Sequence, residues 1–121
     1  MLKAEEIIGR KVKSWGRTLS EAEFALLVTL SWGVAQLHTD AEYMKNTRFG
    51  ERILPGPLVL SLVVGLAAST GVRSLMLECE WKLIGIVGFE NIRLVGAVKP
   101  GDTLWVETEF KEWRSTSKES R

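Results

Sequence analysis

The hydrophobic residues between positions 21 and 30 repeat at helical spacing and predict a helix with a broad apolar face. Ser20 precedes this run and forms a capping box with Glu23, in which each side chain can satisfy a free backbone N–H at the start of the helix. The apolar positions are Ala22, Phe24, Ala25, Leu27, Val28 and Leu30.

A second helix is predicted from Pro57 to Thr70, where apolar residues occupy almost every position. A helix that is apolar on all sides is expected to be enclosed by the rest of the fold. Pro57 suits the first helical residue, with Gly56 before it as the N-cap, and Gly71 suits the end of the helix.

The chain between these helices is more polar. Residues 31–37 predict a loop, and residues 46–50 predict a turn. Thr39 and Glu42 form a second possible capping box, which predicts a short helix from about Asp40 to Asn46.

Strands are predicted on both sides of the helices. Residues 11–17 favour a short strand, and residues 74–83 and 87–98 favour two more, the latter with a bend near a glycine. Residues 99–102 predict a turn. From Thr103 to Trp113 apolar and charged residues alternate, which indicates a half-buried antiparallel strand. The sequence therefore predicts a single α+β domain over residues 1–121.

Composition excludes several classes of function. The 121 residues carry a net charge of +1, which favours neither nucleic acid nor an anionic membrane as a partner. The longest apolar run, Leu58 to Ser69, is too short to span a bilayer comfortably. A single Cys79 cannot form an internal disulfide, so we expect it in the core of a cytoplasmic protein. No His/Cys cluster or phosphate loop points to a metal or another cofactor.

The candidate chemistry centres on His38, the only histidine in the chain. An imidazole near the start of an apolar helix suits proton transfer close to neutral pH. Asp40 follows two residues later and could assist, or it could cap the short helix that begins there. His38 itself could instead be a structural histidine that is hydrogen-bonded in the bend before that helix.

Four segments, in this order, resemble the MaoC-like branch of the hot-dog fold, which includes the (R)-specific enoyl-CoA hydratases and acyl dehydratases. The segments are residues 16–23, the signature-like stretch 38–43, the approach to the central helix from Phe49 to Leu66, and the turn 98–104. The resemblance implies a long central helix wrapped by a curved antiparallel sheet. It also implies an acyl-thioester substrate, on CoA or an acyl carrier, and a homodimer or higher oligomer.

The resemblance further implies roles for particular residues. In the family an aspartate and a histidine hold and deprotonate a water, which adds to the β-carbon of an enoyl thioester. A backbone N–H at the start of the central helix polarises the thioester oxygen. His38 matches the base, and Gly56, after Pro55, matches the oxyanion donor.

Two departures separate this chain from the family pattern. The position of the catalytic aspartate is Gly33, and the asparagine and proline positions of the pattern are Ala35 and Gln36. Family members also continue into further sheet strands beyond the position of Arg121. The last strands are therefore expected to be absent, because the protein is naturally short, because it is truncated, or because a partner supplies them.

Three functional hypotheses follow. The first is a hydratase or dehydratase acting on an acyl thioester, with His38 as base and Gly56 as oxyanion donor. The second is a non-catalytic hot-dog subunit or acyl-CoA-binding module, working as a heterodimer with a catalytic paralogue. The third is an acyl-CoA thioesterase, which ranks last because such enzymes usually place an acid on or near the central helix and residues 57–70 contain none.

Overall fold

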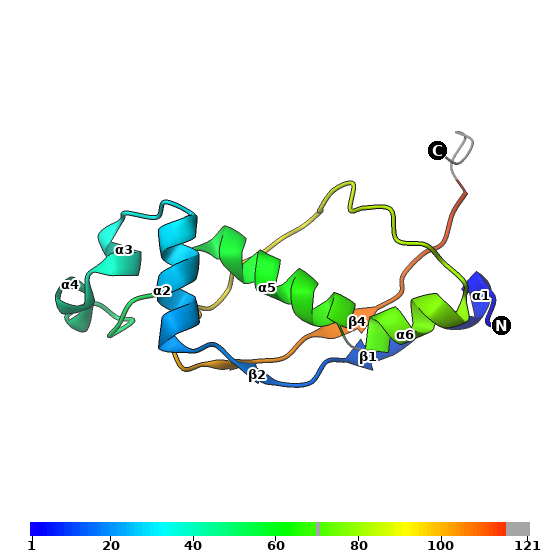
Figure 1. Cartoon of the computed structure of the whole chain (residues 1–121), viewed down its shortest axis with the longest axis horizontal. Coiled ribbons are helices and arrows are strands. Elements are labelled where there is room, and N and C mark those ends of the chain that lie inside the picture. Colours follow the sequence, from blue (N-terminus) through cyan, green and yellow to red (C-terminus); the bar gives the residue numbers. More distant parts are fainter. Residues whose placement is uncertain (70, 116–121) are drawn as a thin grey trace.

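The computed structural model describes residues 1–69 and 71–115. The helices are α1 (Ala4–Ile7), α2 (Glu21–Leu30), α3 (Gln36–Thr39), α4 (Ala41–Lys45), α5 (Gly56–Ser69) and α6 (Gly71–Glu78), and the strands are β1 (Lys11–Lys13), β2 (Arg17–Thr18), β3 (Thr103–Leu104) and β4 (Glu107–Glu109). Helices α5 and α6 lie along one side of a narrow, twisted antiparallel ribbon, α3 and α4 lie beyond one end of it, and α1 lies at the other end (Figure 1).

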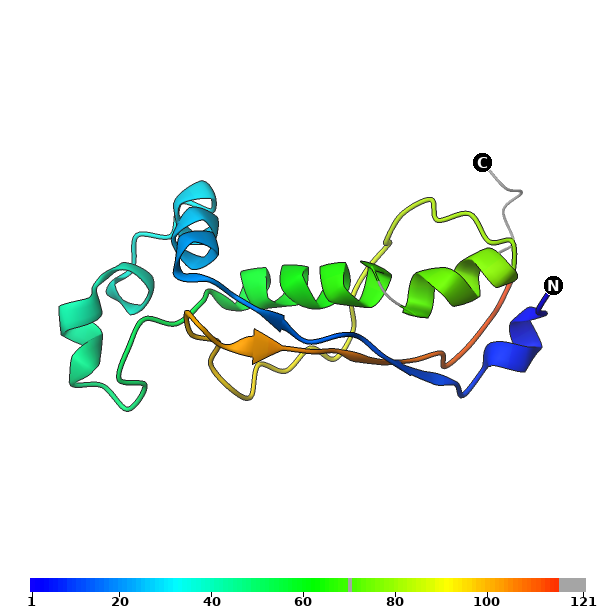
Figure 2. The same ribbon diagram turned by 60° about the horizontal axis from the view of Figure 1, so that its bottom comes forward.

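The ribbon joins the strand predicted at residues 11–17 to the strand predicted at residues 103–113. β1 pairs antiparallel with β4, and β2 pairs antiparallel with β3. The break between them lies at Ser14, a buried polar residue whose hydroxyl accepts a hydrogen bond from the Val106 N–H at 2.8 Å. The Ser14 N–H also donates to the Val106 carbonyl, so the two short ladders form one continuous ribbon (Figure 2).

The alternation predicted after residue 103 is confirmed. Residues 104, 106, 108 and 110 are half-buried, and the residues between them are exposed. The predicted single strand is nevertheless divided into β3 and β4, because the ladder is interrupted at Trp105 and Val106. The turn at residues 99–102 is also confirmed. There Gly101 adopts a left-handed backbone with φ of 88°, and the Lys99 N–H donates to the Asp102 carboxylate at 2.9 Å.

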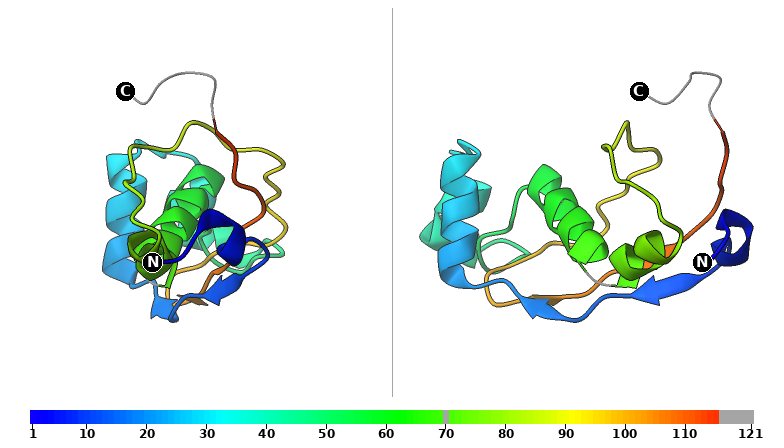
Figure 3. Two further views of the ribbon diagram at one scale, coloured as in Figure 1. Left: turned by 90° about the vertical axis from the view of Figure 1, so that its right-hand side faces the viewer. Right: turned by 45° about the vertical axis from the view of Figure 1, so that its right-hand side comes forward.

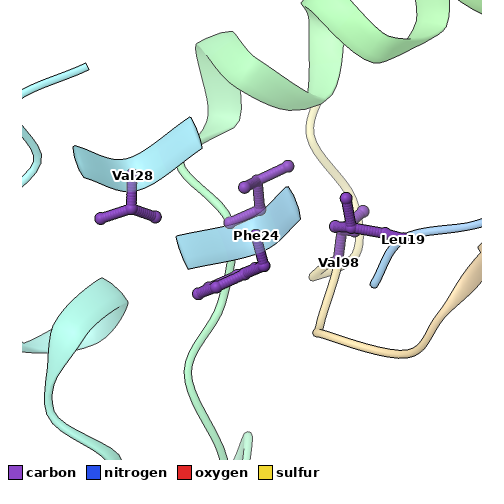
Figure 4. Packing of buried hydrophobic residues seen from close by; sticks show 5 residues of the cluster. Leu19, Phe24, Val28 and Val98 are labelled. Carbon is purple, nitrogen blue, oxygen red and sulfur yellow. The ribbon is translucent and has the colours of Figure 1, made fainter. Parts of the chain in front are cut away.

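The hydrophobic core lies where α2 meets the start of α5. The Ser20–Glu23 capping box predicted for α2 is confirmed in both directions, and it orients the helix so that Phe24 and Val28 point inward. In the view of Figure 4, Phe24 lies between Val28 on one side and Leu19 and Val98 on the other. The buried cluster is Leu19, Phe24, Val28, Leu54 and Val98.

Helix α5 differs from the enclosed helix that the sequence predicted. None of its residues is fully buried. The ribbon and α2 pack against only part of its surface, and the residues that follow α6 run past it as an extended trace without a strand (Figures 1 and 3). The predicted last residue of the helix, Thr70, lies outside the described residues.

The strand predicted at residues 74–83 is wrong, because residues 71–78 form helix α6. The half-buried positions 71, 72, 75 and 76 and the buried Cys79 follow helical rather than alternating spacing. Gly71, predicted as a helix terminator, is instead the first residue of α6 and packs on Val12. The expected core position of Cys79 is confirmed.

The strand predicted at residues 87–98 is also wrong. Residues 81–102 contain no strand, and large apolar side chains in this stretch are exposed, including Ile84, Val87 and Val95. A strand needs hydrogen-bonding partners on a neighbouring chain segment, and the described residues supply none along most of this stretch. At the end of this stretch the Leu54 N–H donates a backbone hydrogen bond to the Val98 carbonyl at 2.8 Å.

Two predictions for the chain between α2 and α5 are only partly confirmed. The predicted loop at 31–37 is shortened, because α3 begins at Gln36. The predicted capping box of Thr39 and Glu42 is replaced by an Asp40 cap on α4, while the Thr39 hydroxyl donates back to the Ala35 carbonyl. The predicted turn at 46–50 is present and ends at Gly50, whose φ is 76°.

Within the described residues no helix taken singly has the length and apolar character to cross a membrane. Taken together, α5 and α6, which are bent relative to each other by 50°, are long and apolar enough by length and composition alone.

Candidate active site

His38 lies on α3 with its ring half-buried against the chain that leads into α5. Its Nδ1 atom is 2.7 Å from the carbonyl oxygen of Ile53. A carbonyl oxygen can only accept a hydrogen bond, so Nδ1 must carry the proton. In the neutral ring the other nitrogen, Nε2, then holds the lone pair. The contact therefore fixes both the orientation of the ring and the tautomer that a base requires.

The backbone reinforces this contact. The Ile53 N–H donates to the Leu37 carbonyl at 2.9 Å, so Ile53 is held by two successive residues of α3. Arg52, next to Ile53, forms an ion pair with Glu21, and its guanidinium lies over the Phe24 ring at 5.2 Å. These contacts attach the segment before α5 to both α2 and α3.

Gly56 begins α5 and offers a free donor. Leu58 and Val59 donate their N–H groups to the Pro55 carbonyl at 3.0 and 3.2 Å, and Pro57 has no N–H. Within residues 1–69 and 71–115, the Gly56 N–H has no acceptor. It is the donor of the first turn that is left for a ligand, at the end of the helix where the dipole is positive. The sequence predicted Gly56 as the N-cap and Pro57 as the first helical residue. The helix begins one residue earlier, so Gly56 is its first residue.

A cavity of about 240 Å³ adjoins this donor. Gly56 and Val59 of α5 form one side, and the stretch from Leu94 to Ala97 forms the opposite side. Arg48, Phe49, Ile53 and Leu54 complete the wall. The wall includes neither His38 nor Pro55. His38 reaches the cavity wall indirectly, through its hydrogen bond to Ile53.

Asp40 is engaged in capping rather than directed at His38. Its Oδ1 accepts the Tyr43 N–H at 2.9 Å at the start of α4. Of the two roles considered for this carboxylate, the structure therefore contains the helix cap, and the described residues include no hydrogen bond between Asp40 and His38. The position of the family aspartate, Gly33, follows α2 and donates its N–H to the Val28 carbonyl at 3.1 Å.

A second, larger cavity of about 290 Å³ lies farther along α5, between Ser61–Ser69 of that helix and the ribbon. Arg17 and Glu23 form an ion pair of 2.7 Å on its wall. Hydrogen bonds from the Ser20 backbone and hydroxyl, together with the charge of Arg17, lower the pKa of Glu23 below its usual value of 4.5. No group of three or more His, Cys, Asp or Glu side chains in the described part of the chain is placed to hold a metal ion.

The sequence indicated His38, Asp40, Gly56 and Pro55 as candidates but not Ile53 and Leu94, which contact His38 and Gly56. The Ile53 carbonyl carries no sequence signal, because any residue presents one. Leu94 lies in a stretch predicted as a strand, and only the tertiary structure brings it against Gly56.

These features define an α+β protein in which a histidine is hydrogen-bonded to the backbone just before a helix. The first residue of that helix carries a free N–H group. Residues 3–121 match the MaoC-like domain, and the chain belongs to that family. It is similar to the protein MaoC of Klebsiella aerogenes, at 35% identity over 87% of this chain. It is also similar to the 3-hydroxyacyl-acyl-carrier-protein dehydratase FabZ of Erythrobacter litoralis, at 36% identity over 61% of this chain.

Solved structures of similar proteins support the hot-dog fold. The (R)-hydratase PhaJ1 of Pseudomonas aeruginosa is 28% identical, with a TM-score of 0.65, over 91% of this chain and 65% of that one. A monoamine oxidase regulatory protein from Archaeoglobus is 30% identical, with a TM-score of 0.70, over 92% of this chain and 71% of that one. Within residues 1–69 and 71–115 the present chain has α+β elements and two small two-stranded sheets, and these do not form a closed sheet. It spans 28% of MaoC and 49% of FabZ.

Proposed function

We propose that this protein is a hydratase or dehydratase that adds water to, or removes it from, an enoyl group carried as a thioester on CoA or an acyl-carrier protein. The observation that carries the proposal is the hydrogen bond from His38 to Ile53, which attaches the base to a residue three positions before Gly56 and its free N–H. Family membership and the similarity to a hydratase and a dehydratase support the same reaction.

In this mechanism the Nε2 atom of His38 takes a proton from a water molecule while the water oxygen bonds to the β-carbon. The electron pair of the double bond moves toward the thioester oxygen, and the Gly56 N–H stabilises the negative charge that develops there. A preorganised backbone donor of this kind is typically worth about 10²–10³ in rate. The imidazolium then returns the proton to the α-carbon, which leaves the histidine neutral for the next cycle.

We further propose that residues 1–121 act as one domain in a homodimer or higher oligomer. Support comes from the exposed apolar side chains between Leu83 and Val95, whose backbone has no strand partner within residues 1–69 and 71–115. A second copy would cover them and pair with that backbone. Light scattering on the purified protein tests this, and a monomer at micromolar concentration would contradict it.

A second candidate function is an acyl-CoA-binding subunit without activity of its own, paired with a catalytic paralogue. Gly33 favours it, because the family aspartate is missing there and Asp40 is already engaged with Tyr43. General acid–base catalysis is typically worth about 10²–10⁴ in rate, so the loss of one of two partners could remove most of the activity.

Hydration of crotonyl-CoA, followed by the loss of enoyl absorbance, distinguishes the two functions. The hydratase predicts turnover in the wild type and its loss in His38→Ala, with Thr39→Ala as a neighbouring control that keeps the histidine. Acyl-CoA binding without turnover in either protein would support the binding subunit instead. Absence of both turnover and binding would contradict both candidates.

A further inference from the structure

The side chain of Leu94 lies directly against the backbone of Gly56. A Cβ atom at Gly56 would be only 2.2 Å from the Leu94 Cδ1 atom and 3.6 Å from its Cγ atom. Both residues line the cavity of about 240 Å³ beside the free Gly56 N–H. Leu94 therefore contacts the residue whose N–H the proposed function assigns to the thioester carbonyl.

The two sides of this cavity differ in how firmly they are held. Leu54 is buried in the core, and Val59 is part of α5 and packs against that core. Leu94 is 56% exposed and comes from a stretch with no strand pairing in the described structure. Its size and position can thus change without disturbing the core, which is a property expected of a residue that sets specificity.

The cavity itself indicates the class of acyl group. Apart from Arg48, its lining side chains are apolar, so it suits an unsubstituted hydrocarbon chain. Its volume of about 240 Å³ is below the roughly 300–1,000 Å³ typical of pockets for drug-sized ligands. An acyl chain of a few carbons would fill such a space.

We propose that Leu94 is a specificity-determining residue that limits this protein to short-chain acyl thioesters by closing the cavity next to Gly56. The inference rests on the proposed function for its substrate, but its physical content is the contact between Leu94 and Gly56. Shortening the side chain should admit longer acyl chains, and enlarging it should exclude them more strictly.

The test compares kcat/KM for crotonyl-CoA and trans-2-octenoyl-CoA in the wild type, Leu94→Ala and Leu94→Phe. We expect the wild type to prefer crotonyl-CoA. In Leu94→Ala the preference should shift toward octenoyl-CoA by about tenfold or more, since a single methylene in a hydrophobic pocket is worth about 10–200-fold. Leu94→Phe should shift it the other way. Leu26→Ala removes the same side chain from a similarly exposed position on α2, outside the cavity and outside residues 83–95, and its preference should equal that of the wild type.

A binding measurement separates failure of this inference from failure of the proposed function. If the wild type hydrates neither substrate, the proposed function fails, and calorimetric titration with butyryl-CoA and octanoyl-CoA then measures the same preference. An unchanged preference in Leu94→Ala and Leu94→Phe, by rate or by affinity, overturns the role of Leu94. Binding of both acyl-CoAs no tighter than free CoA overturns it as well. Thermal unfolding checks that each variant is folded.

Discussion

The Nδ1–H group of His38 donates a hydrogen bond to the Ile53 carbonyl over 2.7 Å. This bond places the proton on the nitrogen that faces the protein backbone and leaves Nε2 as the basic atom. It also ties α3 to the chain that begins α5 at Gly56. One contact therefore has both a structural and a proposed catalytic consequence, and variants at His38 can separate them.

His38→Asn should lose hydration while keeping much of the structural role of the histidine. The amide N–H of asparagine can replace Nδ1–H as the donor to Ile53, but asparagine cannot act as a base. We expect turnover to fall by about 10²–10⁴-fold. The free energy of unfolding, from urea denaturation, should fall less than in His38→Ala, where a hydrogen bond worth about 0.5–1.5 kcal/mol is lost. Equal turnover in His38→Asn and wild type would contradict a catalytic role.

Asp40 is predicted to contribute to stability through the cap of α4. Asp40→Ala removes the acceptor of the Tyr43 N–H and should cost about 1 kcal/mol of unfolding free energy. Asp40→Asn keeps an acceptor without the carboxylate, so both its stability and its hydration rate should stay close to wild type. A folded Asp40→Asn protein without turnover would show instead that the carboxylate takes part in the reaction.

Gly33→Asp is predicted to raise the hydration rate, because it restores a carboxylate at the family position. A Cβ atom there would make ordinary contacts, at 3.6 Å from the Ser31 hydroxyl and a Val28 methyl group, so the change should fold. The gain expected from a second acid–base partner is up to about 10²–10⁴-fold. Gly33→Asn has the same shape without the charge and should give no gain. Equal rates for the two variants would rule out the carboxylate as the cause.

Stability should depend on pH through Glu23, whose pKa is lowered by the hydrogen bonds from Ser20. A carboxyl group with a lower pKa in the folded state stabilises the protein while it is ionised. Its contribution is present above the unfolded value near 4.5 and is lost as the pH falls through the lower folded-state value. Ser20→Ala should make the urea midpoint less sensitive to pH below 4.5, and Ser20→Thr, which keeps the hydroxyl, should behave like wild type. Equal pH profiles for Ser20→Ala and wild type would contradict this role.

Local features of the chain were predictable from the sequence because they depend on residues a few positions apart. The Ser20–Glu23 capping box, the start of α5 near Gly56 and the turn at Gly101 were all found in this way. The same local reasoning failed at residues 71–78, where a short apolar run suited both a strand and a helix. The half-buried positions there follow the helical spacing of α6.

By itself, the sequence determined the α+β class, the family and the identity of His38 and Gly56 as candidates, because motifs and periodicity are properties of neighbouring residues. Only the tertiary structure decided that β1 pairs with β4, that His38 binds the Ile53 carbonyl, and that Leu94 lies on Gly56. Each of these contacts joins segments separated along the chain. Such contacts form only where packing of the whole chain offsets the entropy of bringing those segments together, and no local pattern encodes that balance.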